Sequence, residues 1–278
     1  LNQNLILIDK NYVLKSGIHE IKKPIIIPSG FNLFIEAGSV LKMHKETYIM
    51  VKNGLVNFSG KVGQPIIIES SDKRNKWRGI YVNSKIIEKD ISFFDYVNVS
   101  DYSYFDNGKI QLTGGINLIN GQFNLKNSQF KNSLAEDAIN LVNSKFVLKN
   151  LYILNVNSDA IDIDFGEGQI INSHFQKISG DAIDLSGSKI SIKDIDVSNV
   201  ADKAISVGEE STLNIDNLKI SDSRIGIASK DSSKVEGKKI KISNCGLYDF
   251  AVYQKKSYFS GAFLKVKAET SCKESIVQ

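Results

Sequence analysis

A short phrase of the form Asp-Ala-Ile-Asp returns along the middle of the chain at a constant distance, with weaker copies after it. Its central isoleucines are spaced 22 residues apart, at Ile139, Ile161, Ile183, Ile205 and Ile227. Self-similarity at a fixed period of this length is the signature of a repeat architecture, in which each unit contacts only its neighbours. We therefore expect a solenoid rather than a globule around one central core.

Within each repeat, apolar residues alternate with polar ones, as in Ile190-Ser191-Ile192-Lys193. A period of two predicts strands with one buried face. Asn, Ser, Gly and Asp fill the gaps, for example at 186–188 and 221–223, and these are turn residues. A unit of two or three short strands cannot bury a face alone, so each strand should pair with its equivalents in the coils above and below.

With the phrases Asp-Ala-Ile-Asp-Ile-Asp-Phe (159–165) and Gly-Asp-Ala-Ile-Asp-Leu-Ser-Gly-Ser (180–188), the sequence resembles the pectate-lyase-like superfamily with PbH1-type repeats. The resemblance implies an all-β fold, a single-stranded right-handed parallel β-helix with about a dozen coils of roughly 22 residues. The sequence is also similar to a β-helix group in bacterial surface proteins that carry a CotH kinase-like domain. A leucine-rich repeat has a similar period, but its Leu-x-x-Leu-x-Leu run is absent.

We expect one β-helix domain over the whole chain, 1–278. The step from Val99 to its equivalent Phe130 is 31 residues, so a loop should protrude there. No amphipathic helix precedes Leu5, and solenoid ends need a cap, so we expect an adjacent domain or a loop at the N-terminal end. The expected parts are irregular opening coils (1–70), a protruding loop region (84–115), regular coils (116–245), and a closing coil with a C-terminal cap (246–278).

The composition says little about which partners the chain binds or in which compartment it works. The net charge is +4, and the lysines concentrate after residue 230. Most of them should be solvated strand edges that protect an open end, and the alternative is contact with an anionic polysaccharide. We expect no nucleic acid, because no known module is present, and no membrane span, because no run of 18 apolar residues exists.

Two further features of the chain bear on processing and redox state. The sequence opens at Leu1 rather than Met, so we expect a processed or excised fragment. We expect Cys245 to be a small buried hydrophobic residue, and the alternative is a terminal disulfide between Cys245 and Cys272. This count does not decide the compartment.

Aromatic residues crowd the segment that breaks the rhythm. Tyr102 and Tyr104 are predicted to bind substrate by stacking on sugar rings, and the alternative is that they pack over the coil. Trp77 precedes a strand and is interpreted as a structural corner rather than a sugar platform.

The repeated phrase also carries the candidate chemistry. If Ile161 points inward, its neighbour Asp162 points outward. Stacking then creates two ladders, one on the strand and one at the turn before it. The strand ladder contains Asn140, Asp162, Asp184 and Ser206, and the turn ladder contains Asp137, Asp159, Asp181 and Lys203.

Four of these carboxylates, those of Asp159, Asp162, Asp181 and Asp184, are the candidate metal ligands. Calcium binds oxygen at about 2.3–2.6 Å, so carboxylates across one ion can lie about 5 Å apart, which is the coil spacing. The alternative for Asp159 and Asp181 is that they hydrogen-bond the turn backbone and repeat because the coil repeats.

The residue types also permit catalysis. Asp162 and Asp184 with Lys203 as base would suit a calcium-assisted polysaccharide lyase or an epimerase, with Lys230 as a substrate-binding residue one coil on. Two carboxylates would also suit glycoside hydrolysis. However, the polygalacturonase motifs and the Asp-Pro-His-Asp string of mannuronan epimerases are absent.

We therefore expect a bacterial surface or secreted module that binds an acidic polysaccharide at the Asp-rich face, with calcium. Its expected location is extracellular or in the cell envelope. The alternatives are a polysaccharide lyase or epimerase, and a structural, adhesin or phage-fibre-like spacer, because a fold does not fix a function.

Overall fold

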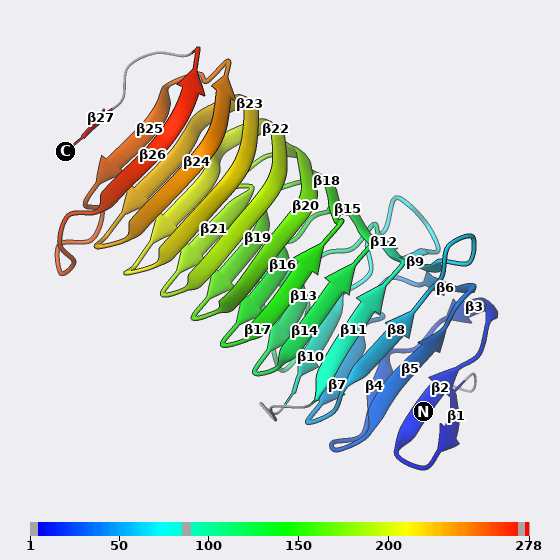
Figure 1. Ribbon diagram of the computed structural model, residues 1–278. Helices are drawn as coiled ribbons and strands as arrows, with labels where there is room; N and C mark the ends of the chain where they lie inside the picture. The colour runs from blue at the N-terminus through cyan, green and yellow to red at the C-terminus, as the bar shows by residue number, and fades with distance from the viewer. Residues whose placement is uncertain (1–4, 85–89, 272–275, 278) are drawn as a thin grey trace.

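The computed structural model describes residues 5–84, 90–271 and 276–277. The chain winds into an elongated stack of strands, with the N-terminus at one end and the C-terminus at the other (Figure 1). The stack has about 10 turns and contains no helix among the described residues. The β-helix architecture is thus confirmed. The turns are fewer than the dozen expected, because several coils before β14 are longer than 22 residues, as in the pairings of Asn57 with Phe93 and of Ile91 with Gln122.

Three parallel stacks of strands, which we name A, B and C, form the sides of the coil. Stack A contains β4 (Ile25–Ile27), β7 (Ile49–Lys52), β10 (Ile80–Asn83), β13 (Gly114–Ile119), β16 (Asp137–Val142), β19 (Asp159–Asp164), β21 (Ile183–Ser186) and β25 (Tyr248–Tyr253). Stack B contains β2 (Asn11–Leu14), β5 (Asn32–Glu36), β8 (Val56–Ser59), β11 (Ile91–Asp95), β14 (Gln122–Lys126) and β17 (Lys145–Lys149). Stack C contains β3 (Gly17–Ile21), β6 (Ser39–Met43), β9 (Ile66–Ser70), β12 (Val97–Ser100), β15 (Gln129–Ser133) and β18 (Tyr152–Val156).

Toward the C-terminus the strands become longer and bend around the corners, so that one strand serves two or three stacks. These are β20 (Glu167–Ile178), β22 (Lys189–Gly208), β23 (Thr212–Lys230), β24 (Lys234–Ser243) and β26 (Phe263–Thr270). The short β27 (Ile276–Val277) pairs with β25. At the other end, β1 (Leu5–Ile8) pairs antiparallel with β2 and leaves Leu7 about half exposed. An adjacent domain at this end stays a prediction.

The core is a column of inward-facing side chains that repeats with the coil. Ile139, Ile161, Ile183, Ile205 and Ile227 follow one another in register, and each is fully buried. Burying one such side chain stabilises the fold by about 1.5–3 kcal/mol. A shift of the register by one residue would turn the whole apolar set outward, so the 22-residue step specifies the pairing.

An asparagine ladder closes the corner between stacks B and C. Asn127, Asn150 and Asn172 all have positive φ (50°, 55° and 45°), a left-handed conformation that Asn tolerates better than most residues. The side-chain amide of Asn150 donates to Asn127 Oδ1 (2.7 Å), and that of Asn172 donates to Asn150 Oδ1 (2.8 Å). The ladder therefore satisfies these amides from one coil to the next.

The aromatic residues at the break in the rhythm form a corner of the core. Trp77 is fully buried and its Nε1–H donates to the carbonyl of Ser100 (2.9 Å), which confirms its structural role. Tyr102 is also fully buried, with its ring centroid 6.1 Å from that of Trp77. The prediction that Tyr102 stacks on sugar is therefore wrong, because the ring packs against Gly115, where an added Cβ would lie 2.5 Å from it.

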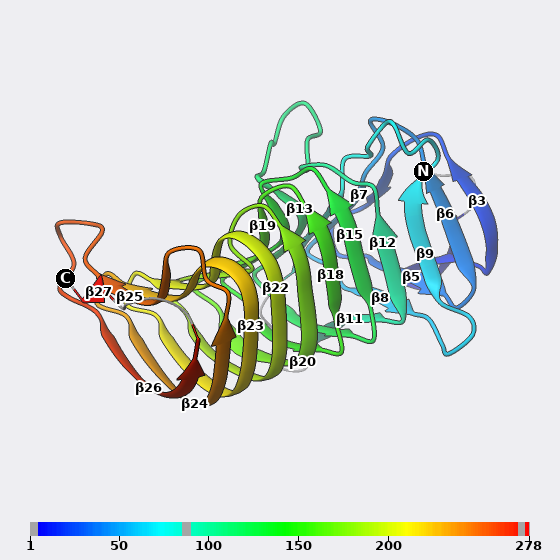
Figure 2. The same ribbon diagram turned by 90° about the horizontal axis from the view of Figure 1, so that it is seen from above.

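The segment after Tyr102 leaves the coil as a loop between β12 and β13 (Figure 2). Phe105 at its base is fully buried and packs with Met50 and Tyr81 on the outer face of stack A. Tyr104 is partly buried, and its ring centroid lies 5.3 Å from the guanidinium carbon of Arg78. The predicted loop region also included 85–89, which lie outside the described residues.

Two remaining expectations concern the membrane and the cysteines. In the parts of the chain that the structure describes, no helix has the length and apolar character needed to cross a membrane. Cys245 Sγ lies 3.5 Å from Ser223 Oγ. Its predicted pairing with Cys272 falls outside the described residues.

Candidate functional site

The strand ladder of the repeated phrase forms on the outer face of stack A. Asp162 of β19 pairs in register with Asp184 of β21, so the two residues occupy consecutive rungs. Asn140 lies one rung before them and Ser206 one rung after. The side-chain amide of Asn140 donates to Asp162 Oδ2 (3.4 Å). The predicted order of this ladder is confirmed.

From Asp159 onward, the turn ladder joins successive coils through hydrogen bonds from the backbone to a carboxylate. The backbone N–H of Asp181 donates to Asp159 Oδ1 (2.7 Å), and that of Lys203 donates to Asp181 Oδ1 (2.9 Å). Asp159 and Asp181 therefore do bind turn backbone, but it is the backbone of the equivalent turn one coil further on. This role leaves the second oxygen of each carboxylate available to other partners, so it does not exclude a ligand role.

Three carboxylates converge where the two ladders meet. We name Asp159, Asp181 and Asp184 the acidic cluster, because one oxygen from each lies within 4.8 Å of the other two. Asp162, the fourth predicted ligand, is not part of this group. An all-carboxylate oxygen set suits a hard cation such as calcium, whose ligands lie at about 2.3–2.6 Å. Of the residues present, these three would therefore hold the ion.

The electrostatics of the site follow from burial and from like charges. Burial, together with repulsion from neighbouring carboxylates, raises the pKa of Asp159 to about 7 and the pKa of Asp162 to about 9. Burial also raises the pKa of Asp181, although Lys203 opposes this rise. Without a cation the site thus retains protons that isolated carboxyls would release near pH 4.

Lys203 lies at the site but is engaged by two carboxylates. Its ammonium lies 3.0 Å from Asp181 Oδ1 and also pairs with Asp202. Burial alone would lower the pKa of Lys203, but attraction to Asp181 and the hydrogen bond to Asp202 raise it above its usual range. These contacts keep the amine protonated and speak against its predicted role as a base. Asp202 lies in no repeated column, so nothing in the sequence singled it out.

Lys230 and Ser206 complete the site on the C-terminal side. Lys230 is buried, and its ammonium lies 3.8 Å from Asp184 Oδ1. The structure thus places this predicted substrate-binding lysine against the acidic cluster. Ser206 is fully buried one rung after Asp184, and its Oγ has no hydrogen-bond partner among the described residues. An unsatisfied buried hydroxyl costs about 1–3 kcal/mol and calls for a ligand or water.

The sequence comparison concerns the repeat region. Residues 137–266 match the family model described as a right handed beta helix region. Together with the parallel stacks, this match assigns the chain the right-handed parallel β-helix fold, as expected. No curated protein matches the chain. The expected similarity to the group with CotH domains stays a prediction.

Solved structures with similar winding come from several sources. One is tailspike protein 2 of Escherichia coli O157:H7 bacteriophage CAB120, with 8% identity and a TM-score of 0.48 over 93% of this chain and 38% of that chain. Another is the catalytic unit of a thermostable α-1,3-glucanase from Streptomyces thermodiastaticus strain HF3-3. It has 10% identity and a TM-score of 0.35 over 96% of this chain and 64% of that chain. A third is an alginate lyase from Paenibacillus sp. str. FPU-7, with 11% identity and a TM-score of 0.37 over 91% of this chain and 99% of that chain. At these identities the likeness concerns the fold alone, and this chain spans less than half of the tailspike.

Proposed function

We propose that this chain is a carbohydrate-associated β-helix module that binds an acidic polysaccharide at the acidic cluster, with calcium between protein and polymer. The observation that carries the proposal is the convergence of three carboxylate oxygens from consecutive coils within 4.8 Å. A bound calcium ion would supply the positive charge that lets a polyanion approach this acidic surface. The location that accompanies this proposal is extracellular or in the cell envelope of a bacterium.

Two properties of the surroundings support a cation at this place. Burial first, and repulsion from neighbouring carboxylates second, raise the pKa values of Asp159 and Asp162, and a cation would stabilise the charged forms against both effects. The buried hydroxyl of Ser206 lies next to Asp184 and lacks a partner within the described residues. It supplies a further oxygen donor on the same side of stack A.

The test measures calcium binding and polymer binding in parallel. We expect calcium to raise the melting temperature above that in EDTA, and the double variant Asp181→Asn with Asp184→Asn to lose this rise. The control is Asp196→Asn, which removes a half-exposed carboxylate on stack C that lies 3.7 Å from His174 Nδ1. Labelled polygalacturonate should bind the wild type more tightly with calcium than with EDTA, and the double variant equally in both. Identical melting with and without calcium would exclude the metal.

A calcium-assisted lyase or epimerase is the second candidate, and the position of Lys230 beside Asp184 is the observation that favours it. Lys230 would then contact the substrate, while Asp162 and Asp184 would act on it. The two candidates separate in a turnover assay that follows the ultraviolet absorbance of unsaturated uronates and the epimer ratio by NMR. A binding module leaves the absorbance and the epimer ratio unchanged even when it is saturated with polymer. A spacer would not bind the polymer at all.

A further inference from the structure

The outer face of stack B carries a long shallow groove that is separate from the acidic cluster. Two adjoining depressions, each about 770 Å³, share Gln169, Ser191 and Asn214 and together reach from Ile91 in β11 to Lys267 in β26. The groove runs along the solenoid axis and crosses successive coils, so its shape suits a linear polymer rather than a compact ligand.

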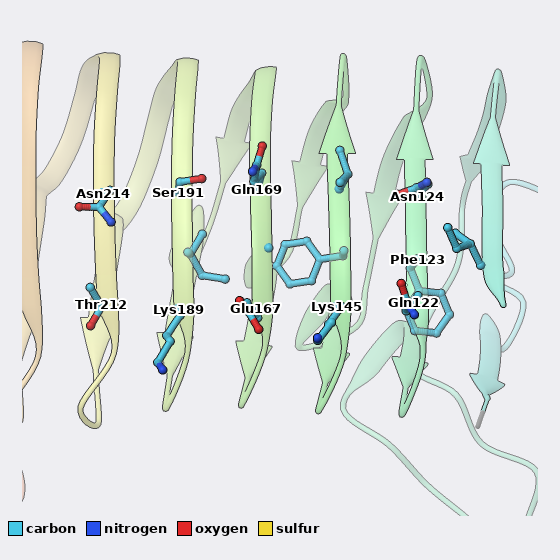
Figure 3. A pocket seen from close by; sticks show the side chains of 15 residues that line it. Gln122, Phe123, Asn124, Lys145, Glu167, Gln169, Lys189, Ser191, Thr212 and Asn214 are labelled. Carbon is cyan, nitrogen blue, oxygen red and sulfur yellow. The ribbon is translucent and has the colours of Figure 1, made fainter. Parts of the chain in front are cut away.

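Neutral amides and hydroxyls form the middle of this groove. Asn124, Gln169, Ser191 and Asn214 lie in one row, interrupted by Val147, because equivalent positions of successive coils pair in register. Figure 3 shows these four polar side chains in line across the coils. Rungs are about 4.8 Å apart, so the row offers hydrogen-bond donors and acceptors at regular intervals, which suits sugar hydroxyls.

Lysines flank this polar row on both sides. The first flank contains Lys145, Lys189 and Lys234, and Figure 3 shows the first two in a line beside the polar row. The second flank contains Lys126, Lys149, Lys193, Lys238 and Lys267. On the first flank the lysines occupy alternate coils, about 10 Å apart, and on the second flank they occupy consecutive or alternate coils.

The balance of charge on this face is strongly positive. From β14 to β26 the outward positions of stack B carry nine lysines and three acidic residues, Glu167, Asp216 and Glu236. Glu236 is paired with Lys234 (3.0 Å) and Asp216 with Lys239 (3.3 Å). Among the residues that the structure describes, no ion pair engages Lys145, Lys149, Lys189 or Lys193. These four ammonium groups are exposed and free to meet an anionic partner.

We propose that the groove on stack B is a second binding surface, for a linear anionic polysaccharide, that works without calcium. The acidic cluster repels a polyanion unless a cation intervenes, whereas the lysine rows attract one directly. Among the described side chains that point outward on stack B from β14 to β26, Phe263 is the one aromatic residue, and it lies beside Lys234 at the C-terminal end of the groove. Single-stranded nucleic acid relies on aromatic stacking platforms, so a polysaccharide fits this face better than a nucleic acid.

The test uses two charge-reversed proteins with the same net charge. One carries Lys145→Glu and Lys189→Glu in the groove, and the matched control carries Lys131→Glu and Lys219→Glu on stack C. The probe is fluorescein-labelled polygalacturonate in EDTA, titrated at low and at high salt. We expect at least tenfold weaker binding for the groove variant, little change for the control, and loss of wild-type binding at high salt. Equal melting temperatures verify that the variants are folded.

Each alternative outcome overturns the proposal. Equal weakening by both variants would mean that net charge alone is sensed, and no wild-type binding in EDTA would mean that the groove is not a site. Tighter binding of a labelled oligothymidylate than of polygalacturonate would assign the groove to nucleic acid. The variant Asp181→Asn with Asp184→Asn should keep all binding in EDTA, so the groove and the calcium site can fail independently.

Discussion

The carboxylate of Asp181 lies 3.0 Å from the ammonium of Lys203 and accepts a 2.9 Å hydrogen bond from the backbone N–H of the same lysine. One side chain therefore closes the turn into the next coil and holds a positive charge beside the acidic cluster. Both side chains are largely buried, with 7% and 13% of their surfaces exposed. Lys203 is thus the built-in counter-charge of the cluster rather than a free base.

Replacing this lysine should expose its role. We expect Lys203→Met to lower the free energy of unfolding in EDTA by about 3 kcal/mol, because it leaves a buried carboxylate without its partner. Calcium should recover part of the loss, since the ion would take over the same charge. Urea unfolding in EDTA and in calcium measures both effects, with the exposed Lys219→Met as control. A loss of equal size in the two buffers would show that calcium does not reach Asp181.

The free energy of unfolding should fall as the pH rises, whereas carboxylates paired with cations on a protein surface usually make it rise. The pKa of Asp159 is raised to about 7 and that of Asp162 to about 9, chiefly by burial. A carboxyl whose pKa is raised on folding contributes stability in full below its unfolded pKa of about 4, and this stability is lost as the pH rises through the folded pKa. The free energy of unfolding in EDTA should therefore fall from about pH 5 to pH 9.

The variant Asp162→Asn isolates the upper part of this fall. An amide does not titrate, so we expect a flatter stability curve above about pH 7 for this variant. Urea unfolding at a series of pH values is the measurement, with Asp196→Asn on stack C as the matched control. Stability that rises with pH in the metal-free wild type would contradict the burial of these carboxyls.

The two tyrosines predicted to bind sugar should behave differently from each other. Tyr102 is fully buried against Trp77, so Tyr102→Ala should cost about 3–5 kcal/mol through the cavity that it leaves. Tyr104 contacts Arg78 from a partly exposed position, so Tyr104→Ala should cost less than about 1 kcal/mol. Thermal unfolding compares the variants. A Tyr102→Ala protein of wild-type stability that no longer binds polymer would restore the original prediction.

The asparagine ladder offers a test of how the corners are held. Asn150 combines a positive φ of 55° with hydrogen bonds to both Asn127 and Asn172. We expect Asn150→Ala to cost about 2–3 kcal/mol, because it adds left-handed strain of about 1–2 kcal/mol to the lost bonds. Asn150→Gly removes the bonds without the strain and should cost less. If the glycine variant is the less stable of the two, the strain contribution is wrong.

The register of the stack was predictable because it depends on the repeat spacing, which can be counted directly in the sequence. Ile161 and Ile183 are 22 residues apart, and that number alone placed Asp162 beside Asp184. The lysine columns of stack B carry the same signal, since Lys145 and Lys189 are 44 residues apart, two coils. Spacing along a repeat thus translates directly into neighbours across it.

The contacts within the site were harder to predict from the sequence, because they depend on the direction in which each side chain points. Spacing placed four carboxylates near one another, but it could not tell that Asp162 stays outside the group formed by Asp159, Asp181 and Asp184. Tyr102 lies where the period fails, so no column indicated that its ring turns inward. Pairing partners such as Asp202 also lie outside the repeated columns.

The equivalence of successive coils has a consequence for how such a chain can change during evolution. Loss of residues 160–181, a length of 22, would join Asp159 to Ala182 and recreate the same phrase one coil shorter. Apolar columns and corner ladders would still meet their counterparts, and Asp137 would take the place of Asp159 in the turn ladder, so three carboxylates would again converge. Loss of a whole unit can therefore shorten the solenoid in a single genetic step and still rebuild its ion site, without passing through an unfolded ancestor.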